Sequence, residues 1–285
     1  MSSKKNAENQ PRGYGFRVAP GERFDLDAID PRHDDAPDGT DWKRAAGEAR
    51  LADNHLRLNE LQRRLYAGNR HGLLIVLQGM DTAGKDGLIR HVLGAFNPQG
   101  VRVVPFKVPT EEELAHDFLW RVHRHTPRRG RVSVFNRSHY EDVLVVRVKQ
   151  LVPDPVWQAR YDHINAFEKL LTDSGVTVVK LFLHISPEEQ GDRLRKRQIN
   201  PDKHWKFSPG DLEDRKLWPR FRHAYEEALT RCNTPWAPWW VVPADKKWYR
   251  NLCASEILLE VLEGLDLEYP KPIEALESYV IPEVY

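Results

Sequence analysis

The amino-acid sequence predicts an α/β fold in which helices cover both faces of a mostly parallel, five-stranded sheet. Short apolar runs alternate with helix-like segments along most of the 285 residues, and this alternation is typical of parallel sheets with crossover helices. The apolar run at 73–77 is followed at once by the motif G-x-x-x-x-G-K, which predicts a buried strand leading into a phosphate-binding loop. A chain of this length forms one large α/β domain or two small ones, and we expect a single domain.

The composition excludes several classes of protein. Hydrophobic residues make up 40% of the chain, but it has no run of 18 apolar residues, so we expect no membrane span. The first ten residues lack the apolar stretch of a signal peptide, and Cys232 and Cys253, the two cysteines, lack metal-binding spacing. A reduced, cytoplasmic protein is therefore expected. The formal net charge of +1 argues against a general nucleic-acid binder.

The first half of the chain predicts an arm followed by alternating helices and strands. Residues 1–40 are rich in Pro, Gly and Asp and predict an extended arm that is ordered only where it packs on something. Asp41 is a candidate N-cap for a helix over 41–66, where leucines recur near helical spacing. Thr110 and Glu113 form a capping box and predict a helix to about residue 123. We further expect strands at 73–78, 101–106 and 132–136, and a helix at 87–96.

The second half continues this alternation. A helix is expected at 155–173, which Gly175 should end, before a strongly apolar strand at 176–185. Ser186 and Glu189 form another capping box, and Ser208 repeats this helix-start signal 22 residues later. The last strand and helix are expected at 239–243 and 248–265, so the core spans 73–265. The tail at 266–285 carries three tyrosines that pack either on their own chain or on a neighbour: Tyr269, Tyr279 and Tyr285.

The phosphate-binding loop predicts an anion site. Its residues are Gly79, Met80, Asp81, Thr82, Ala83, Gly84, Lys85 and Asp86. Gly79 and Gly84 permit backbone conformations that turn successive N–H groups towards an anion. Lys85 adds a positive charge, and the helix that begins there adds its positive dipole end.

Two acids in this loop predict a metal ion. Asp86 stands where the usual loop has a Ser or Thr that holds Mg²⁺, and Asp81 lies inside the loop. Carboxylates are good ligands for Mg²⁺, so Asp81 is a candidate ligand for Mg²⁺, or for Mn²⁺ in its place. Two alternatives stay open: Asp81 stabilises the loop by accepting backbone N–H groups, or the loop is degenerate and binds phosphate without turnover.

Positive charge is concentrated in two segments of the chain. Between residues 193 and 206 six basic residues stand against one acid: Arg193, Arg195, Lys196, Arg197, Lys203 and Lys206. Arg193, Lys196 and Arg197 share one helical face, and aromatic residues are interleaved with the later lysines. This pattern favours a mobile flap that closes over a polyanion, and the alternative is a solvated helix face. The five arginines between 121 and 131 either line the same channel or face water.

These features are expected to meet at one site. In open α/β sheets ligands bind at the carboxyl ends of the strands. The phosphate-binding loop, Asn136 and Arg137 after the third strand, and the basic segment after the fourth all lie at that edge. Such fixed positive charge suits a substrate with dense negative charge. It favours phosphoryl transfer, whose catalysis is mostly positioning and charge neutralisation.

Three motifs in order, at 79–87, 135–142 and 203–212, resemble those of the family-2 polyphosphate kinases, and the similarity spans about residues 41–265. The resemblance implies a three-layer P-loop kinase core with a helical lid, expected at 187–217. It also implies Mg²⁺-dependent, reversible transfer of the terminal phosphate of inorganic polyphosphate to a nucleotide, from AMP to ADP and from ADP to ATP. The run His139-Tyr140-Glu141 resembles the branch that accepts AMP as well as ADP.

The resemblance also implies roles for individual residues. Asp81, Lys85, Arg137 and the lid residue Arg193 match functional positions, whereas Asn136 stands where many members have Asp, so its contact with the metal stays open. The expected polyphosphate-binding residues are Lys85, Arg137, Arg193, Lys196, Arg197, Lys203 and Lys206, and the expected nucleotide-binding residues are Tyr140, Glu141 and Asp142. The implied partners are polyphosphate and adenine or other purine nucleotides. A homo-oligomer is implied, without membrane or nucleic acid.

The residues leave two other functions open, each with an observation against it. An ATP-dependent kinase of a small acceptor would need a site for the donor adenine, and the sequence shows no clear one. A non-catalytic module that binds polyphosphate or nucleic acid would not need Asp81 and Asp86 beside the loop, because acids weaken anion binding unless a metal is present.

Overall fold

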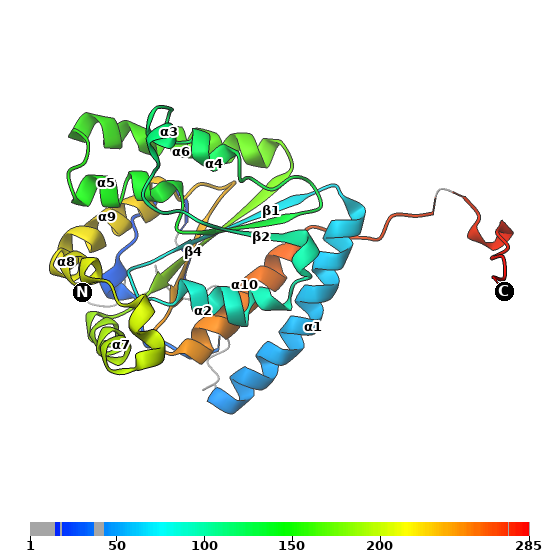
Figure 1. Ribbon diagram of the computed structural model, residues 1–285, viewed down its shortest axis with the longest axis horizontal. Helices are drawn as coiled ribbons and strands as arrows, with labels where there is room; N and C mark the ends of the chain where they lie inside the picture. Colours follow the sequence, from blue (N-terminus) through cyan, green and yellow to red (C-terminus); the bar gives the residue numbers. More distant parts are fainter. Residues whose placement is uncertain (1–14, 18, 37–42, 273, 285) are drawn as a thin grey trace, which may run out of the picture.

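A parallel five-stranded sheet forms the centre of the molecule (Figure 1). The computed structural model describes residues 15–17, 19–36, 43–272 and 274–284. The strands are paired in the order β2-β3-β1-β4-β5, and every pairing is parallel. Their bounds are Gly72–Gln78 (β1), Val101–Pro105 (β2), Val132–Asn136 (β3), Val176–His184 (β4) and Trp239–Pro243 (β5). The predicted α/β fold with a mostly parallel sheet is thus confirmed.

The strand register brings three chain segments together at one edge. β1 lies between β3 and β4, and Leu77 is opposite both Asn136 and Leu181. The phosphate-binding loop leaves the end of β1, the segment with Arg137 leaves the end of β3, and the basic segment follows β4. Because all strands run in the same direction, these segments leave from the same edge.

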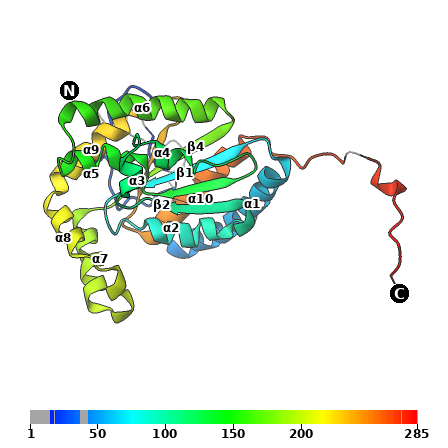
Figure 2. The ribbon, with the colours of Figure 1, turned by 45° about the horizontal axis from the view of Figure 1, so that its top comes forward.

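Helices cover both faces of the sheet (Figures 1 and 2). On one face lie α1 (Arg44–Gly68), α2 (Lys85–His91) and α10 (Lys247–Glu263). The other face carries α3 (Glu111–Leu114), α4 (Trp120–His123), α5 (Val145–Val148), α6 (Asp154–Asp173) and α9 (Trp218–Arg231). Between β4 and α9 the chain forms α7 (Pro187–Ile199), the 3-10 helix η5 (Pro201–Lys206) and α8 (Pro209–Lys216), of which α7 and η5 project from the body (Figure 2).

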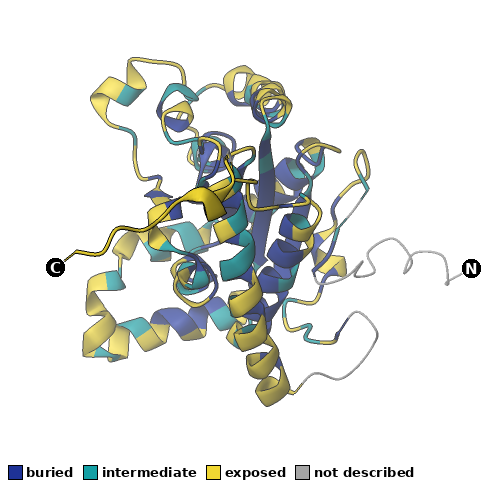
Figure 3. Cartoon of the chain, turned by 90° about the vertical axis from the view of Figure 1, so that its right-hand side faces the viewer, coloured by how far each residue is buried: buried dark blue, intermediate teal, exposed yellow. Residues whose placement is uncertain are grey.

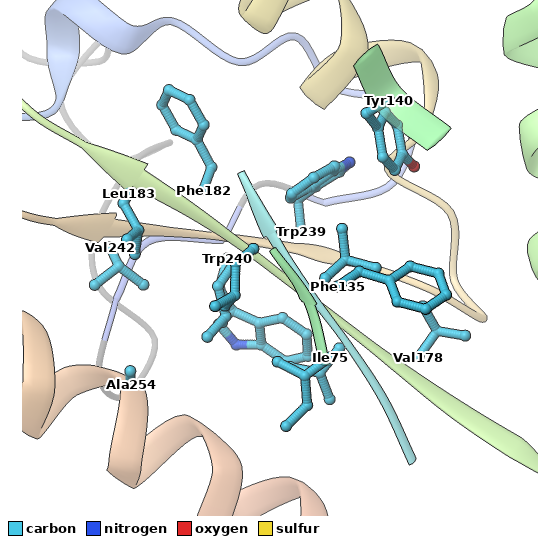
Figure 4. Close-up of a cluster of buried hydrophobic side chains, with 14 of the residues drawn as sticks. Ile75, Phe135, Tyr140, Val178, Phe182, Leu183, Trp239, Trp240, Val242 and Ala254 are labelled. Carbon is cyan, nitrogen blue, oxygen red and sulfur yellow. The ribbon is translucent and has the colours of Figure 1, made fainter. Parts of the chain in front are cut away.

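The core lies between the sheet and these helices, where buried strands and helix faces meet (Figure 3). Every residue of β1 is buried, as expected for a central parallel strand. Figure 4 shows Trp239 of β5 beside Tyr140, and their ring centroids are 4.8 Å apart in an edge-to-face arrangement. Aromatic pairs of this kind add about 0.5–1.5 kcal/mol beyond their buried area.

Most strands lie within a residue or so of their predicted bounds, but one helix differs. The capping box of Thr110 and Glu113 is present, yet the predicted helix to residue 123 is wrong, because α3 ends at Leu114 and α4 begins at Trp120. Asp117 accepts the N–H of Leu119 at 3.0 Å, so its side chain favours a turn over a continuous helix. The helix predicted at 87–96 ends at His91 and continues as a 3-10 turn, η2 (Leu93–Ala95).

The described part of the N-terminal arm packs onto the body. Phe16 forms an antiparallel bridge with Val241 of β5, and Phe24, Leu26 and Ile29 are buried. Asp25 caps the short 3-10 helix η1 (Leu26–Ala28). The predicted cap Asp41 lies outside the described residues.

The C-terminal tail leaves the body beside the end of α1 and extends away from it, with a 3-10 turn, η6 (Leu276–Ser278) (Figures 1 and 2). Leu267, near the start of the tail, is buried in the core, whereas the large apolar side chains from Tyr269 onward are exposed where they are described. None of the helices in the described part of the chain has both the length and the apolar character that a bilayer span requires.

Candidate active site

The phosphate-binding loop is closed around the ammonium of Lys85. Lys85 Nζ donates to the carbonyl of Gly79 at 2.6 Å and to that of Met80 at 3.3 Å. Gly79 and Gly84 have φ angles of +149° and +108°, and a Cβ on Gly79 would lie 2.7 Å from the carbonyl oxygen of Leu183. Burial, and then the charge of Arg137, lower the pKa of Lys85 to about 8. The ammonium is therefore charged near neutral pH and poised to change its charge just above it.

Arg137 links the loop to the segment that follows β3. Its Nη2 donates to Asp81 Oδ1 at 2.5 Å, and its Nη1 donates to Glu141 Oε2 at 3.4 Å. Its φ angle of +62° is uncommon for a residue with a side chain, and such strain is concentrated at functional sites. The structure thus brings Asp81, Lys85 and Arg137 together, as the topology predicted.

Asn136 lies on the other side of the loop. Its Nδ2 donates to Asp86 Oδ1 at 2.9 Å, and Lys206 Nζ donates to Asp86 Oδ2 at 3.3 Å. Burial alone would raise the pKa of Asp86, but the hydrogen bond from Asn136 and the nearby ammonium lower it overall. Asp86 is therefore ionised at neutral pH, and it connects the loop to η5.

The loop separates two clefts. The smaller, which we term the loop cleft, has a volume of about 330 Å³, and its lining includes Asp81, Lys85, Asp86, Phe106, Lys107, Asn136 and Arg137. The larger, which we term the basic cleft, has a volume of about 930 Å³ and is lined by nine Lys or Arg residues against three acids. Both clefts share Gly84, Arg197 and Lys206, so they meet at the loop.

The donor set of the loop cleft fits a magnesium ion. Within the ranges that the structure describes, no group of three or more His, Cys, Asp or Glu side chains forms a ready metal cage. Two carboxylates, of Asp81 and Asp86, nevertheless line this cleft. Mg²⁺ is usually held by one or two carboxylates together with substrate phosphates and waters. The residues present therefore suit Mg²⁺ better than a caged ion such as zinc.

The role predicted for Arg193 requires a correction, because its side chain borders the basic cleft but uses its hydrogen-bond donors within the protein. It is buried, and its Nε donates to Glu189 at 2.7 Å. Its Nη1 donates to the carbonyls of Thr82 and Ala83, and its Nη2 to those of Ala244 and Asp245, at 2.7–3.1 Å. A guanidinium has five N–H donors, so all are used here. Arg193 ties the loop to the end of β5 and acts as a positioning residue.

The other predicted cations of segment 187–217 do border the clefts. Lys196, Lys203 and Lys206 line the basic cleft. Arg197 Nη1 donates to the carbonyl of Lys206 at 3.1 Å and to Asp211 at 3.0 Å, and so fixes η5 against α8.

The nucleotide-binding role predicted for Tyr140 and Asp142 is also corrected. Tyr140 is fully buried, and its hydroxyl donates to Glu168 at 2.8 Å and accepts from Lys180 at 2.8 Å. Asp142 is buried and accepts a hydrogen bond from Arg160 at 3.0 Å, although burial raises its pKa to about 6. Both side chains therefore point into the core and hold the segment in place, whereas Glu141 pairs with Arg137 at the site.

The structure adds cations that the sequence reading missed. Arg250, on the first turn of α10, is only 2% exposed and borders the basic cleft. Its Nε and Nη2 donate to Asn251, and its Nη1 lies 3.4 Å from the carbonyl of Ala83. Burial, and then the charge of Arg193, lower its pKa to about 10. Arg44, Arg90 and Lys247 complete this side. The only signal in the sequence for the position of Lys247 and Arg250 beside the site is that α10 begins where β5 ends, at the edge of the sheet that carries the loop.

The arginines between 121 and 131 do not act as one group. Arg121 is buried and donates to the carbonyl of Lys107 at 2.9 Å. Arg128, Arg129 and Arg131 directly precede β3 and lie at the opposite edge of the sheet from the loop. Of the two alternatives left open for this cluster, a lining of the active-site channel does not hold, and Arg124, Arg128 and Arg129 are exposed.

Comparisons with known proteins all lead to one family. The family model described as polyphosphate kinase 2 matches residues 41–270. The chain is 56% identical over 266 residues to an AMP/ADP-polyphosphate phosphotransferase of Meiothermus ruber, covering 93% of this chain and 98% of the relative. It is 42% identical over 276 residues to an ADP-polyphosphate phosphotransferase of Rhodopseudomonas palustris, covering 91% and 93%. A crystal structure of polyphosphate kinase 2 from Arthrobacter aurescens superposes with a TM-score of 0.87 at 45% identity, covering 92% of each chain.

Proposed function

The chain belongs to the polyphosphate kinase 2 family, and on this premise we propose that it is a polyphosphate-dependent nucleotide kinase. It transfers the terminal phosphoryl group of inorganic polyphosphate to AMP and ADP, and it also catalyses the reverse reaction. The named activities of two relatives support this proposal. The observation that carries it is the grouping of Asp81, Lys85 and Arg137 at a loop that opens onto the basic cleft.

Polyphosphate occupies the basic cleft and ends at the loop. The loop N–H groups and Lys85 hold its terminal phosphates, because anions bind at such backbone nests. The nine cations around the cleft, among them Lys196 and Lys203, offset the charge of the chain, and two of them, Arg197 and Lys206, also line the loop cleft. We assign the approach of the nucleotide to the loop cleft, beside Arg137 and Glu141.

The chemical step needs little proton transfer. A terminal phosphate oxygen of the nucleotide attacks the terminal phosphorus of polyphosphate. The bond from that phosphorus to its bridging oxygen breaks, and the electron pair leaves with the shortened chain. No base has to remove a proton first, because the second pKa of a phosphate monoester is about 6. Arg137 and Lys85 therefore position and neutralise the reacting groups.

Magnesium is the proposed cofactor, with manganese as a substitute. Asp81 is the first candidate to hold it, with Asp86 beside the same cleft, and the amide oxygen of Asn136 is a weaker candidate. When bound, the ion neutralises phosphate charge that the protein's own cations leave uncompensated. Asp81 also accepts from Arg137, so it orients the guanidinium that faces the acceptor.

Segment 187–217 acts as a lid over the loop. Its tip contacts the loop through the pair of Lys206 and Asp86 at 3.3 Å, and its Trp205 is 78% exposed. Exposed ion pairs of this kind contribute about 0–1 kcal/mol. Opening the tip is therefore cheap, which a lid that admits a long polyanion requires.

The location, assembly and base preference complete the proposal. Cys232 and Cys253 are free and buried, which suits a reducing compartment such as the cytoplasm. Adenine nucleotides are the expected acceptors, ahead of other purine nucleotides, and a homo-oligomer is the expected assembly.

One assay tests the proposal. The purified protein is mixed with Mg²⁺, AMP and long-chain polyphosphate, and we expect ADP and then ATP as products. Lys85→Ala and Arg137→Ala should each lower turnover by about 10²–10³-fold, as removal of one charge-stabilising group does, with the fold retained. Arg220→Ala, at an exposed position on α9, is the matched control. Product only with ATP as donor, or binding without turnover, would contradict the proposal.

A further inference from the structure

We infer a second polyanion-binding site at the edge of the sheet opposite the active site. It holds the distal part of the polyphosphate donor, and so it rests on the proposed function. The site consists of two adjoining hollows of about 600 and 350 Å³, which share Arg128 and Arg131. We refer to them together as the arginine hollow.

The arginine hollow has an unbalanced positive charge. Four arginines and no acid line it: Arg102, Arg128, Arg129 and Arg131. The whole chain has a net charge of only +1, so the positive charge of the hollow is a local excess and does not reflect a generally basic protein. Burial, and then Arg102 and Arg124, lower the pKa of His125 on the wall of the hollow, as a positive surrounding does.

The arginines are available to a ligand. Arg131 is fixed in place, since its guanidinium stacks 4.4 Å from the ring of Tyr66 and donates to the carbonyl of Gln99. Arg102, Arg128 and Arg129 are exposed and form no ion pair with an acid of the described residues. Arginine presents a planar fork of donors that matches phosphate oxygens bidentately. A cluster of unpaired arginines is therefore suited to a phosphate chain.

One helix connects the hollow with the basic cleft. His55 of α1 borders the basic cleft and Tyr66 of α1 borders the arginine hollow. Eleven residues separate them, which is about 16 Å at 1.5 Å per residue and returns to the same helix face. Asn59 and Gln62 lie between them on that face and contact the backbone at 95–97. Gln62 is buried and Asn59 is half-buried, so α1 fixes the spacing between the hollow and the basic cleft, and a polyanion that reaches both must pass outside this contact.

The experiment compares long and short donors. In Arg128→Ala/Arg129→Ala we expect the KM for long-chain polyphosphate to rise about tenfold, with a shallower dependence on salt by about one unit of slope for each arginine removed. The KM for a short chain that cannot extend past the basic cleft, the KM for AMP and kcat should stay unchanged. The matched control, Arg23→Ala/Arg220→Ala, removes two exposed arginines elsewhere and should leave all values unchanged.

Three outcomes would overturn the inference. They are an unchanged long-chain KM with an unchanged molecular mass, an equal rise of KM for short and long chains, and an unchanged long-chain KM with an altered molecular mass by light scattering. The last would assign the hollow to a contact between copies, for which the acidic tail of a second chain is a candidate. Failure of the proposed function is distinct from these results, because the unaltered protein would then turn over neither donor.

Discussion

The buried pair of Lys180 and Glu168 gives a sharp prediction about stability. Both side chains are fully buried, and Lys180 Nζ donates to Glu168 at 2.6 Å, to the hydroxyl of Tyr140 at 2.8 Å and to the carbonyl of Cys232 at 2.7 Å. Lys180→Met removes the ammonium and leaves the carboxylate in the core. Breaking a buried pair in this way costs about 3–5 kcal/mol. At roughly 2–4 °C per kcal/mol the melting temperature should fall by about 10 °C.

The second variant separates lost charge from lost volume. Lys180→Met/Glu168→Leu removes both charges, and apolar replacement of a whole buried pair is often neutral or stabilising. We therefore expect the double variant to recover most of the free energy of unfolding measured by urea denaturation.

The pH dependence of the stability of Lys180→Met provides a second test. Burial raises the pKa of Glu168, and in the unaltered protein the charge of Lys180 outweighs this and lowers it. Without Lys180 the folded state of the single variant binds a proton more tightly than the unfolded state does. Its stability should thus rise as the pH falls. Two results would refute this reasoning. One is a free energy of unfolding of Lys180→Met within about 1 kcal/mol of that of the unaltered protein at neutral pH. The other is a double variant that is less stable than the single variant.

Three further predictions concern the loop and its clefts. Gly84→Ala should lower the free energy of unfolding by about 1–3 kcal/mol and remove most of the activity, because the φ angle is +108° and a Cβ would lie 1.8 Å from Arg250. Urea unfolding and turnover measure both effects. The control is Gly94→Ala, where a Cβ meets nothing within 4 Å. Because the pKa of Lys85 is about 8, the KM for polyphosphate should rise about tenfold for each pH unit above that value. In Lys85→Arg the KM should depend less on pH, and an equally steep dependence in that variant would count against this explanation. Added salt should raise the KM for polyphosphate steeply, and a flat salt titration would exclude the basic cleft as its site.

The strands and the loop could be predicted because their signals are local. The apolar run of β1 and the motif from Gly79 to Lys85 specify a strand and an anion nest without reference to the rest of the chain. The meeting of Asp81 with Arg137 followed from topology alone, since parallel strands end at the same edge. In contrast, α9 was missed although Phe221, Tyr225 and other buried residues recur at helical spacing along it.

The roles of Arg193 and Tyr140 could not be predicted, because they depend on what packs behind them. Helical spacing placed Arg193 on one face with Lys196 and Arg197, but α7 has a single buried large apolar residue, Leu194, so the pattern did not indicate which face turns inward. Tyr140 lies in a motif beside the site, yet its side chain is enclosed by residues about 30 and 40 positions further along the chain. Spacing gives proximity along the chain and not the direction of a side chain.

The cations around the loop fall into two groups with different energetic consequences. The donors of Arg193 are all satisfied by the protein, whereas Arg250 is buried with one amide partner, a carbonyl at 3.4 Å and no carboxylate in the described chain. With a pKa of about 10 it is charged at neutral pH, so the free protein carries a buried charge that lacks a counter-ion.

A phosphate chain in the basic cleft supplies that counter-ion. Polyphosphate at about one hundred times its Kd should stabilise the protein by about 2.7 kcal/mol, as a rise in melting temperature. Arg250→Met should be at least as stable as the unaltered protein without ligand, since an unpaired buried charge is removed, and should gain clearly less from polyphosphate. The matched variant Lys246→Met, which loses an exposed lysine beside the same helix, should keep the full gain. If Arg250→Met is destabilised but gains as much from the ligand, the guanidinium is structural and does not face the chain.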